Sequence, residues 1–184
     1  RSVSRGLGDV YKRQAISSGP GSYTGLRIGA AAAKGLCYAN DIPLISIPTL
    51  DIVAREITPK DGQIIATLDA RRDEVYFAIY THDYQLIHAA SPHVITPKSF
   101  TEWTAEGPVY FVGTGLEKCE EIIDHNTQFI FPKEPSYPSA EHMVKQAQHA
   151  FKQKRFEDLA YFDVDYLKAF QTSPEKKNAF GQTS

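Results

Sequence analysis

The segment GPGSYTGLRIGAAAAKG, residues 19–35, joins a glycine-rich turn directly to a run of small residues. Ser22 or Thr24 can cap a helix at this turn, because a short hydroxyl side chain accepts a hydrogen bond from an amide of the first helical turn. The helix should end near Asn40, since Asn-Asp followed by Pro43 is a sequence that stops helices. Such a segment is either a phosphate cradle or a surface that packs closely against another element.

The common nucleotide motifs fail in this segment. A Walker A loop needs a lysine after its last glycine, but Gly25 is followed by Leu26 and Arg27. A Rossmann fingerprint needs its third glycine one position earlier, within a strand–helix–strand unit that has an acidic partner. The amides at a helix N-terminus can still hold an anion, so the turn is either a candidate anion-binding site or an ordinary tight turn. The candidate residues are Gly19, Gly21, Ser22 and Thr24.

One face of the helix after the turn carries, at about four-residue spacing, Gly25, Gly29, Ala32 or Ala33, and Leu36. All of these except Leu36 have small side chains. A glycine inside a helix costs up to ~1 kcal/mol relative to alanine, so Gly29 indicates that something packs tightly there. That element lies either in the same lobe or on a partner subunit, and the sequence leaves both alternatives open.

The rest of the chain alternates between strand and helix patterns. A strand at 44–47 precedes a helix that Thr49 caps and that runs to about Ile57. Beyond it the patterns predict strands at 64–70, 74–81 and 86–95, a helix at 97–105, a strand at 109–112, a helix at 116–124, a strand at 129–131 and a helix at 140–154. The order βββαβαβα is that of a ribonuclease-H-like lobe, which is duplicated in actin-like ATPases. The predicted fold class is therefore α/β, actin-like and two-lobed, with the first lobe incomplete.

These patterns divide the chain into four parts. Residues 1–14 are basic and glycine-broken, lack any regular period, and resemble an adaptor-derived leader found in translated environmental assemblies. We expect 1–14 to be a non-native leader, with an ordinary disordered tail as the alternative. We expect 15–60 to be a remnant of the first ribonuclease-H-like lobe, 61–170 the second lobe, and 171–184 a flexible tail.

Composition narrows the classes of function. A formal net charge of −2 without a local basic run provides little attraction for polyanions, which disfavours direct RNA binding. Cys37 and Cys119 form no CxxC pair, so buried thiols are expected rather than a disulfide or a zinc site. No apolar run approaches the ~20 residues that span a bilayer. We expect a cytoplasmic protein with no membrane partner.

Patterns typical of catalysis are sparse. A two-metal site needs several converging carboxylates. The sequence does not place other carboxylates with Asp69 in such a pattern, so we interpret Asp69, together with Arg71 and Arg72, as part of a charged turn at a strand end. The six histidines are scattered, without an HExxH or HxxxH arrangement, and we expect them at the surface. The sequence therefore predicts no catalytic residues, no metal and no cofactor.

Six motifs connect the chain to a known family: GPGSYTGLRIGAAAAKGL, PLISIPTLDIVA, LDARRDEVYFAIY, FVGTGLEK, the helix start PSAEHM, and VDYLK. Together, from about Ala15 to about Phe170, they resemble TsaB, the dimerisation subunit of the bacterial tRNA threonylcarbamoyladenosine (t6A) synthesis complex. The resemblance implies the actin-like fold of the catalytic subunit TsaD without its activity. Family members begin with strands that should precede Ala15, so the resemblance also implies that part of the first lobe is missing and that this fragment is unstable.

The resemblance further implies a scaffold that binds TsaD as a heterodimer through the helices 24–40 and 49–57. The ATPase TsaE joins that pair, tRNA is contacted only indirectly, and a homodimer through the same face is the alternative assembly. The implied interface residues are Gly21, Arg27, Ile28, Ala31, Ala32 and Gly35.

The HxxxH metal site of TsaD-like proteins falls on Thr49 and Val53 in this chain. Valine has no ligand atom, so the resemblance implies that the metal site is lost. Two other functions stay open from the sequence. An actin-like ATPase or kinase would need phosphate loops in both lobes, and a metallopeptidase of the glycoprotease-like family would need the lost metal ligands.

Overall fold

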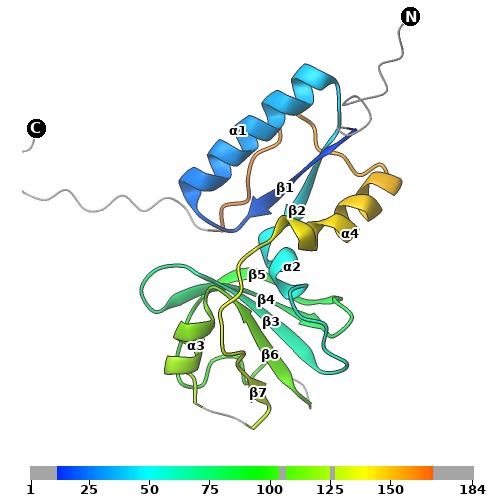
Figure 1. Cartoon of the computed structure of the whole chain (residues 1–184). Helices are drawn as coiled ribbons and strands as arrows, with labels where there is room; N and C mark the ends of the chain where they lie inside the picture. The colour runs from blue at the N-terminus through cyan, green and yellow to red at the C-terminus, as the bar shows by residue number, and fades with distance from the viewer. Residues whose placement is uncertain (1–11, 104–106, 125–126, 168–184) are drawn as a thin grey trace, which may run out of the picture.

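A computed structural model of the chain describes residues 12–103, 107–124 and 127–167. They form a two-stranded and a five-stranded sheet with helices around them (Figure 1). The strands are β1 (Gln14–Gly19), β2 (Leu44–Pro48), β3 (Gln63–Asp69), β4 (Glu74–Thr81), β5 (Leu86–Val94), β6 (Val109–Gly113) and β7 (Phe129–Ile130). The helices are α1 (Tyr23–Asn40), α2 (Thr49–Ala54), α3 (Leu116–Ile122) and α4 (Ala140–Lys152).

The smaller sheet pairs β1 with β2 in parallel, and α1 is the connection between them. The Ser22 hydroxyl accepts a hydrogen bond from the Gly25 amide at 3.3 Å, which confirms Ser22 as the cap of α1. One face of this sheet packs on α1 through Cys37 and Leu44. The other face packs on α4 through residues that include Ile45 and Ala150.

The larger sheet has the strand order β5-β4-β3-β6-β7. Its first three strands in sequence are antiparallel neighbours, whereas β6 and β7 join in parallel. This is the predicted meander followed by a crossover. Phe77 lies at the centre of its core, with its ring centroid 5.1 Å from those of both Phe100 and Trp103.

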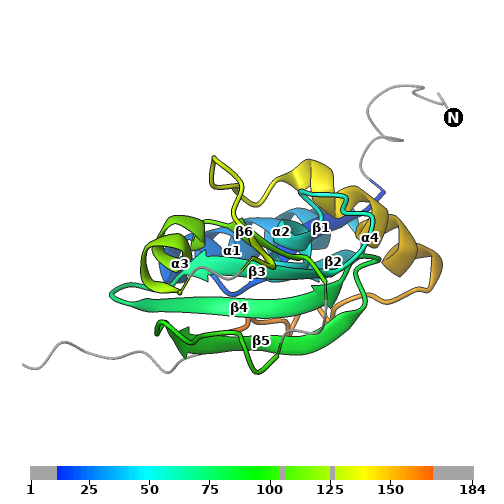
Figure 2. The same cartoon turned by 90° about the horizontal axis from the view of Figure 1, so that it is seen from below.

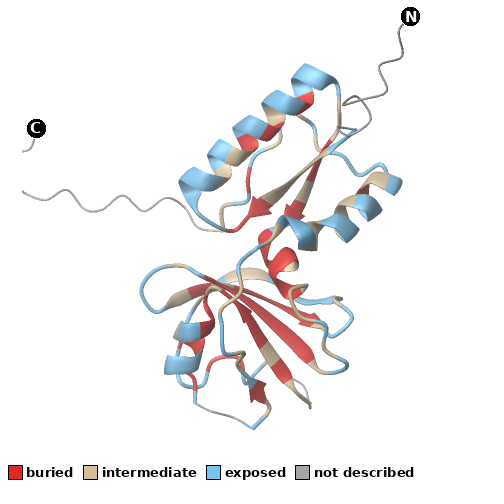
Figure 3. Ribbon diagram, viewed as in Figure 1, coloured by how far each residue is buried: buried red, intermediate tan, exposed pale blue. Residues whose placement is uncertain are grey.

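The short helix α2 lies between the two sheets (Figure 1), and Figure 2 shows the larger sheet with β4 between β5 and β3. Leu50 and Val53 pack on the larger sheet, and Ile52 packs on the smaller one. Figure 3 shows α2 as a buried element, because every residue in it except Asp51 is buried. Burial on both sides explains why its sequence, TLDIVA, is apolar nearly all round.

The helix predicted at 97–105 is wrong over the described residues 97–103, which form turns. Phe100 has a φ of 70°, a left-handed conformation that no regular helix contains. The Ser99 hydroxyl accepts from the Thr96 amide at 2.8 Å, and the Trp103 amide donates to the Phe100 carbonyl at 3.1 Å. These local bonds replace helical ones, so the second lobe lacks the first helix of the order βββαβαβα over these residues.

The sequence patterns do not predict the strand β1, because the first elements expected from them are a turn and a helix. Its run AISS is short, and Ile16 is its one large apolar residue, which packs towards α1. Gln14, assigned to the expected leader, begins this strand, while residues 1–11 and 168–184 lie outside the described ranges.

The domain boundaries stay a prediction, on which one observation bears. The helix α4, expected in the unit 61–170, contacts β2 and α2 of the unit 15–60. The segment after α4 continues along that unit, since the Glu157 amide donates to the Leu44 carbonyl at 2.9 Å and the Asp165 amide to the Ser18 carbonyl at 2.7 Å. Residues late in the chain therefore complete the smaller sheet.

Cys37 and Cys119 are both buried free thiols, as predicted. Burial raises the pKa of Cys119 to about 12. Among the helices of the described ranges, none has both the length and the apolar character that a bilayer crossing requires.

Candidate functional site

One side of α1 is exposed to water although it carries large apolar residues. Three of the 18 residues of α1 are buried, namely Ala30, Ala33 and Cys37. Its large apolar side chains remain in water, with Ile28 66% and Leu36 53% exposed. Figure 3 shows α1 as mostly exposed, in contrast to α2. An amphipathic helix normally carries polar residues on such a face.

The expected interface residues all lie in exposed positions: Gly21, Arg27, Ile28, Ala31, Ala32 and Gly35. Within α1 they follow helical spacing from Ile28 through Ala31 and Ala32 to Gly35. The sequence left open whether the small residues at four-residue spacing pack within the chain or on a partner, and two of them pack within the chain. Ala33 is buried, and a methyl group added at Gly29 would lie 3.7 Å from Ile16. We call the set Ile28, Ala31, Ala32 and Gly35 the outward face of α1.

Arg27 borders this face and is held in place by two tyrosines. Its Nε donates to the Tyr166 hydroxyl at 3.0 Å, and its guanidinium lies 4.3 Å from the centroid of the Tyr23 ring. The two tyrosine rings are 5.0 Å apart. The end of the described chain is thereby fixed beside the start of α1.

The second helix expected in the interface does not share this exposure. Its residues Leu50, Ile52 and Val53 are between 0% and 1% exposed, inside the cores of the two sheets. A partner could reach them only after α4 or a sheet had moved. Of the two helices expected in the interface, α1 is therefore the accessible one.

The positions of the expected lost metal site are structural. The Thr49 and Ser17 hydroxyls are 2.5 Å apart, which joins α2 to β1, and Val53 is fully buried. Within the described ranges, no group of three histidine, cysteine, aspartate or glutamate residues is arranged to hold a metal ion.

The candidate anion-binding turn stays a prediction, and its surroundings weigh against it. Gly19 has a φ of 120°, and a methyl group there would lie 2.6 Å from the Asp165 carbonyl oxygen, so glycine is required for close packing. Ser22 already uses its hydroxyl as the cap of α1. A shallow cavity of about 290 Å³ beside Ser18 is lined by four acidic residues, Glu157, Asp158, Asp163 and Asp165. Their charge would repel an anion.

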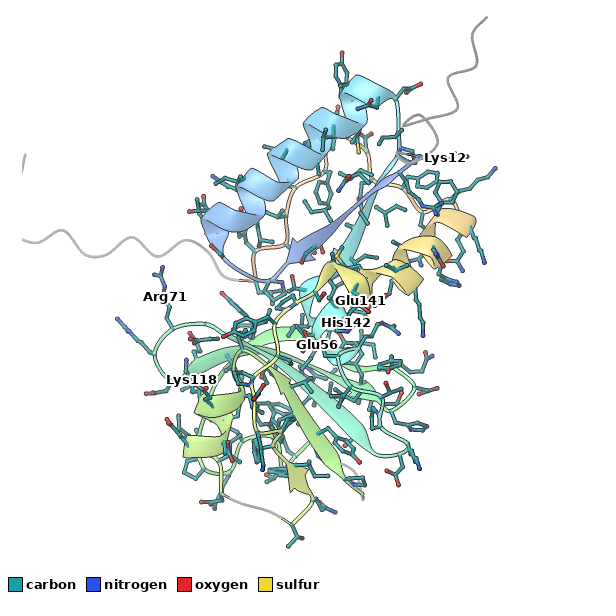
Figure 4. The ribbon with its side chains drawn as sticks, viewed as in Figure 1. Lys12, Glu56, Arg71, Lys118, Glu141 and His142 are labelled. Carbon is teal, nitrogen blue, oxygen red and sulfur yellow. The ribbon has the colours of Figure 1, made fainter. Side chains whose placement is uncertain are left out.

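The charged turn between β3 and β4 has the structural character that the sequence indicated. Lys118 of α3 donates to the Asp69 carboxylate, and that contact lowers the pKa of Asp69. Arg71 and Arg72 have φ values of 71° and 50°, and Figure 4 shows Arg71 pointing away from the sheet. Two consecutive left-handed residues form the tight connection of the hairpin.

Three histidines contradict the prediction that all lie at the surface. His88 and His93 are half-buried, and their ring centroids lie 4.8 and 5.5 Å, respectively, from that of Phe77. Burial lowers the pKa of His93. His142 of α4 is half-buried, and its Nδ1 is shielded from water without a hydrogen-bond partner among the described residues. The spacing of the histidines in the sequence does not predict their burial, because it depends on contacts with residues of other elements, such as Phe77 of β4 for His88 and His93 of β5.

Glu56, just after α2, lies near His142 at the junction of the two sheets (Figure 4). Both of its carboxylate oxygens are shielded from water. Burial raises the pKa of Glu56, and the proximity of Ser136 and His142 offsets only part of that effect. The charged carboxylate is therefore a source of instability in the fold.

We predict that Glu56→Gln raises the free energy of unfolding by about 1 kcal/mol at about pH 7, because the amide keeps the shape and removes the buried charge. A carboxyl group whose pKa is raised by folding stabilises the fold when protonated, and that contribution is lost as the pH rises through the folded pKa. The gain over wild type should therefore shrink towards about pH 4, below the ordinary value of 4.5. Urea unfolding across this range measures it.

The control for this prediction is Glu120→Gln, which removes an exposed carboxylate on α3. It should change stability by less than about 0.5 kcal/mol at either pH. A Glu56→Gln variant that is less stable than wild type at neutral pH would show that the carboxylate has a partner in solution.

Comparison with known proteins identifies relatives along nearly the whole chain. Residues 12–181 match the family model described as TsaD: tRNA N6-adenosine threonylcarbamoyltransferase. The tRNA threonylcarbamoyladenosine biosynthesis protein TsaB of Bacillus subtilis is 30% identical over 158 residues, which cover 83% of this chain and 68% of that protein. The protein of the same name from Escherichia coli is 31% identical over 160 residues, covering 84% and 69%.

Two solved structures from Pseudomonas aeruginosa have the same fold. One, described as an uncharacterized protein with similarity to peptidase YEAZ, has a TM-score of 0.71 and 22% identity. The other, YeaZ, has a TM-score of 0.67 and 24% identity. Each alignment covers 88% of this chain and 76% of the solved chain. The α/β fold class with its actin-like architecture is thereby confirmed.

Proposed function

Because the chain belongs to the TsaB family of tRNA threonylcarbamoyladenosine biosynthesis proteins, we propose that it is a non-catalytic subunit that binds and supports a TsaD-type partner. The partner transfers the threonylcarbamoyl group to the tRNA adenosine next to the anticodon. The present chain provides the surface on which that partner is held, in the cytoplasm.

The outward face of α1 is the observation that supports this proposal. Ile28 is 66% exposed at one end of a face whose other members are two alanines and a glycine. Exposed apolar surface of this kind is a mark of protein–protein contact in a soluble protein. The tyrosines and the arginine at its border, Tyr23, Tyr166 and Arg27, are residue types that dominate interface energetics.

The shape of the outward face favours a helix as the contacting element. Small side chains at Ala31, Ala32 and Gly35 leave the α1 backbone close to the surface, and nothing lies within 4 Å of a methyl group added at Gly35. A second helix can therefore approach closely and seat its own side chains between these positions. Two copies of this chain could use the same face as an isologous homodimer.

The absence of catalysis in this subunit is supported by the positions where TsaD-like proteins have metal ligands. Thr49 is occupied by its contact with Ser17, and Val53 is buried in the core. Neither position can bind a metal in the way that an imidazole pair does. We assign the chemistry to the TsaD-type partner, and further assembly with a TsaE-type ATPase to the pair rather than to this chain alone.

The experiment that tests the proposal is size-exclusion chromatography of the chain mixed with the TsaD-type protein of the same genome. We expect a complex of one copy of each, at an elution volume that neither protein shows alone. Separate elution at micromolar concentrations would contradict the proposal, whereas a dimer of the chain alone would identify the homodimer.

A further inference from the structure

A groove of about 350 Å³ lies between α4, the end of β2 and α2. The helices α1 and α4 cover opposite faces of the smaller sheet, so the groove is remote from the outward face of α1 (Figure 1). Its charged and amide side chains are Asp51, Arg55, Lys145, Gln146, His149 and Arg155.

The charge of this groove is opposite to that of the chain. Arg55, Lys145 and Arg155 contribute three positive charges, against one negative charge from Asp51 among the described lining residues. The chain as a whole has a formal net charge of −2. A concave surface that gathers one sign of charge concentrates ligands of the opposite sign. The groove is therefore a candidate site for an anion.

Arg55 is held firmly within the groove wall. Its guanidinium lies 4.5 Å from the centroid of the Tyr84 ring, and its Nη2 is 3.4 Å from the Asp51 carboxylate. Packing on both sides fixes the direction of the guanidinium before any ligand arrives, which reduces the entropy lost on binding.

The helix dipole does not account for the three positive charges of the groove. His149 lies in the last turn of α4, where positive side chains offset the negative end of a helix. Lys145 lies in the middle of α4, and Arg55 belongs to a different element. Arg155 follows α4, where its amide donates to the Ala150 carbonyl and its Nε donates to the Gln153 side-chain oxygen at 2.7 Å. These three positive side chains line the same groove, where an anion would offset their charge.

We propose that the groove binds phosphate groups of an RNA backbone. Its described lining has no phenylalanine, tyrosine or tryptophan ring on which a nucleobase could stack, so the chemistry present is that of phosphate contacts. Such contacts position an RNA without reading its sequence. The choice of RNA over a free phosphate ester rests on the proposed function, and it replaces the expectation that tRNA is contacted only indirectly.

The test is the affinity of the full chain for a fluorescent tRNA transcript, measured by anisotropy between 50 and 200 mM salt. We expect Lys145→Gln with Arg155→Gln to weaken binding about tenfold or more and to reduce the slope of log K against log salt by about 2. The matched control is Lys60→Gln with Lys98→Gln, which removes two exposed positive charges outside the groove. The control should change the affinity less than about twofold.

Three outcomes would overturn the inference. Equal losses in both double variants would show that binding is diffuse. Loss of inorganic phosphate binding with unchanged tRNA binding would show a site for small anions. Loss of binding to the TsaD-type partner with unchanged tRNA binding would show that the groove contacts a protein. Because complex formation is measured on the same variants, failure of the groove is distinguished from failure of the proposed function.

Discussion

Ala31→Arg should abolish the complex with a TsaD-type partner while leaving this chain folded. Ala31 is exposed at the centre of the outward face of α1, so the longer side chain meets only water in the free protein. In the complex it would force a charge between two closely packed helices, where removal from water is costly. We expect a dissociation constant at least about 100-fold higher, equivalent to about 3 kcal/mol. Isothermal titration calorimetry measures this change.

The matched control is Ala89→Arg, which introduces the same side chain at an exposed position of β5 in the larger sheet. It should bind the partner as wild type does. Circular dichroism spectra and melting curves of both variants should match those of wild type, since exposed substitutions usually change stability by less than about 0.5 kcal/mol. Equal affinity of the Ala31→Arg and Ala89→Arg variants would show that α1 does not form the interface.

Gly113→Ala should strongly destabilise the fold. Gly113 ends β6 with a φ of 102°, and a methyl group there would lie 2.0 Å from the Thr67 carbonyl oxygen and 2.8 Å from Val53. Strain and overlap each cost about 1–3 kcal/mol, so we expect a total loss of about 3 kcal/mol or more. With a urea slope of about 2 kcal/mol per molar, the unfolding midpoint should fall by about 1.5 M.

Gly35→Ala is the opposite case and the control for Gly113→Ala. Nothing lies within 4 Å of the added methyl group, and the position is inside the exposed part of α1. Alanine should therefore stabilise the helix by about 0.5–1 kcal/mol. A similar destabilisation by both substitutions would contradict the packing around Gly113.

The sequence predicted the elements whose patterns are local. The strands β3 and β4 are mostly apolar runs on either side of a short charged turn, and their observed bounds differ from the expected ones by one residue at most. Ser22 identified the start of α1, because capping depends on a hydroxyl within one turn of the helix.

The turns at 97–103 could not be predicted from their own residues. Phe100 takes a left-handed conformation and is 1% exposed, with its ring packed against Phe77 and Phe111. The free energy of burying this ring offsets the backbone strain. Those contacts come from β4 and β6, which helix propensity within the segment does not include.

The sequence indicates which residue types α1 carries, but it does not indicate which of them face the smaller sheet and which face water. The spacing of small residues does not distinguish Gly29 and Ala33 from Ala32. In the structure, Gly29 and Ala33 face the smaller sheet, whereas Ala32 is exposed. The direction depends on Ile16 of the unanticipated strand β1. The basic groove had no signal in the sequence at all, since Arg55 and Arg155 are 100 positions apart and meet only when α4 packs on β2.

The most direct test of the account is the rate of t6A formation on unmodified tRNA, quantified by mass spectrometry of the nucleosides. The reaction contains the TsaD-type partner and the remaining components of the pathway, with or without this chain. We predict that t6A forms when wild type or Ala89→Arg is present and that the rate falls to background with Ala31→Arg or without the chain. The same rate of t6A formation without the chain would contradict its role as the supporting subunit.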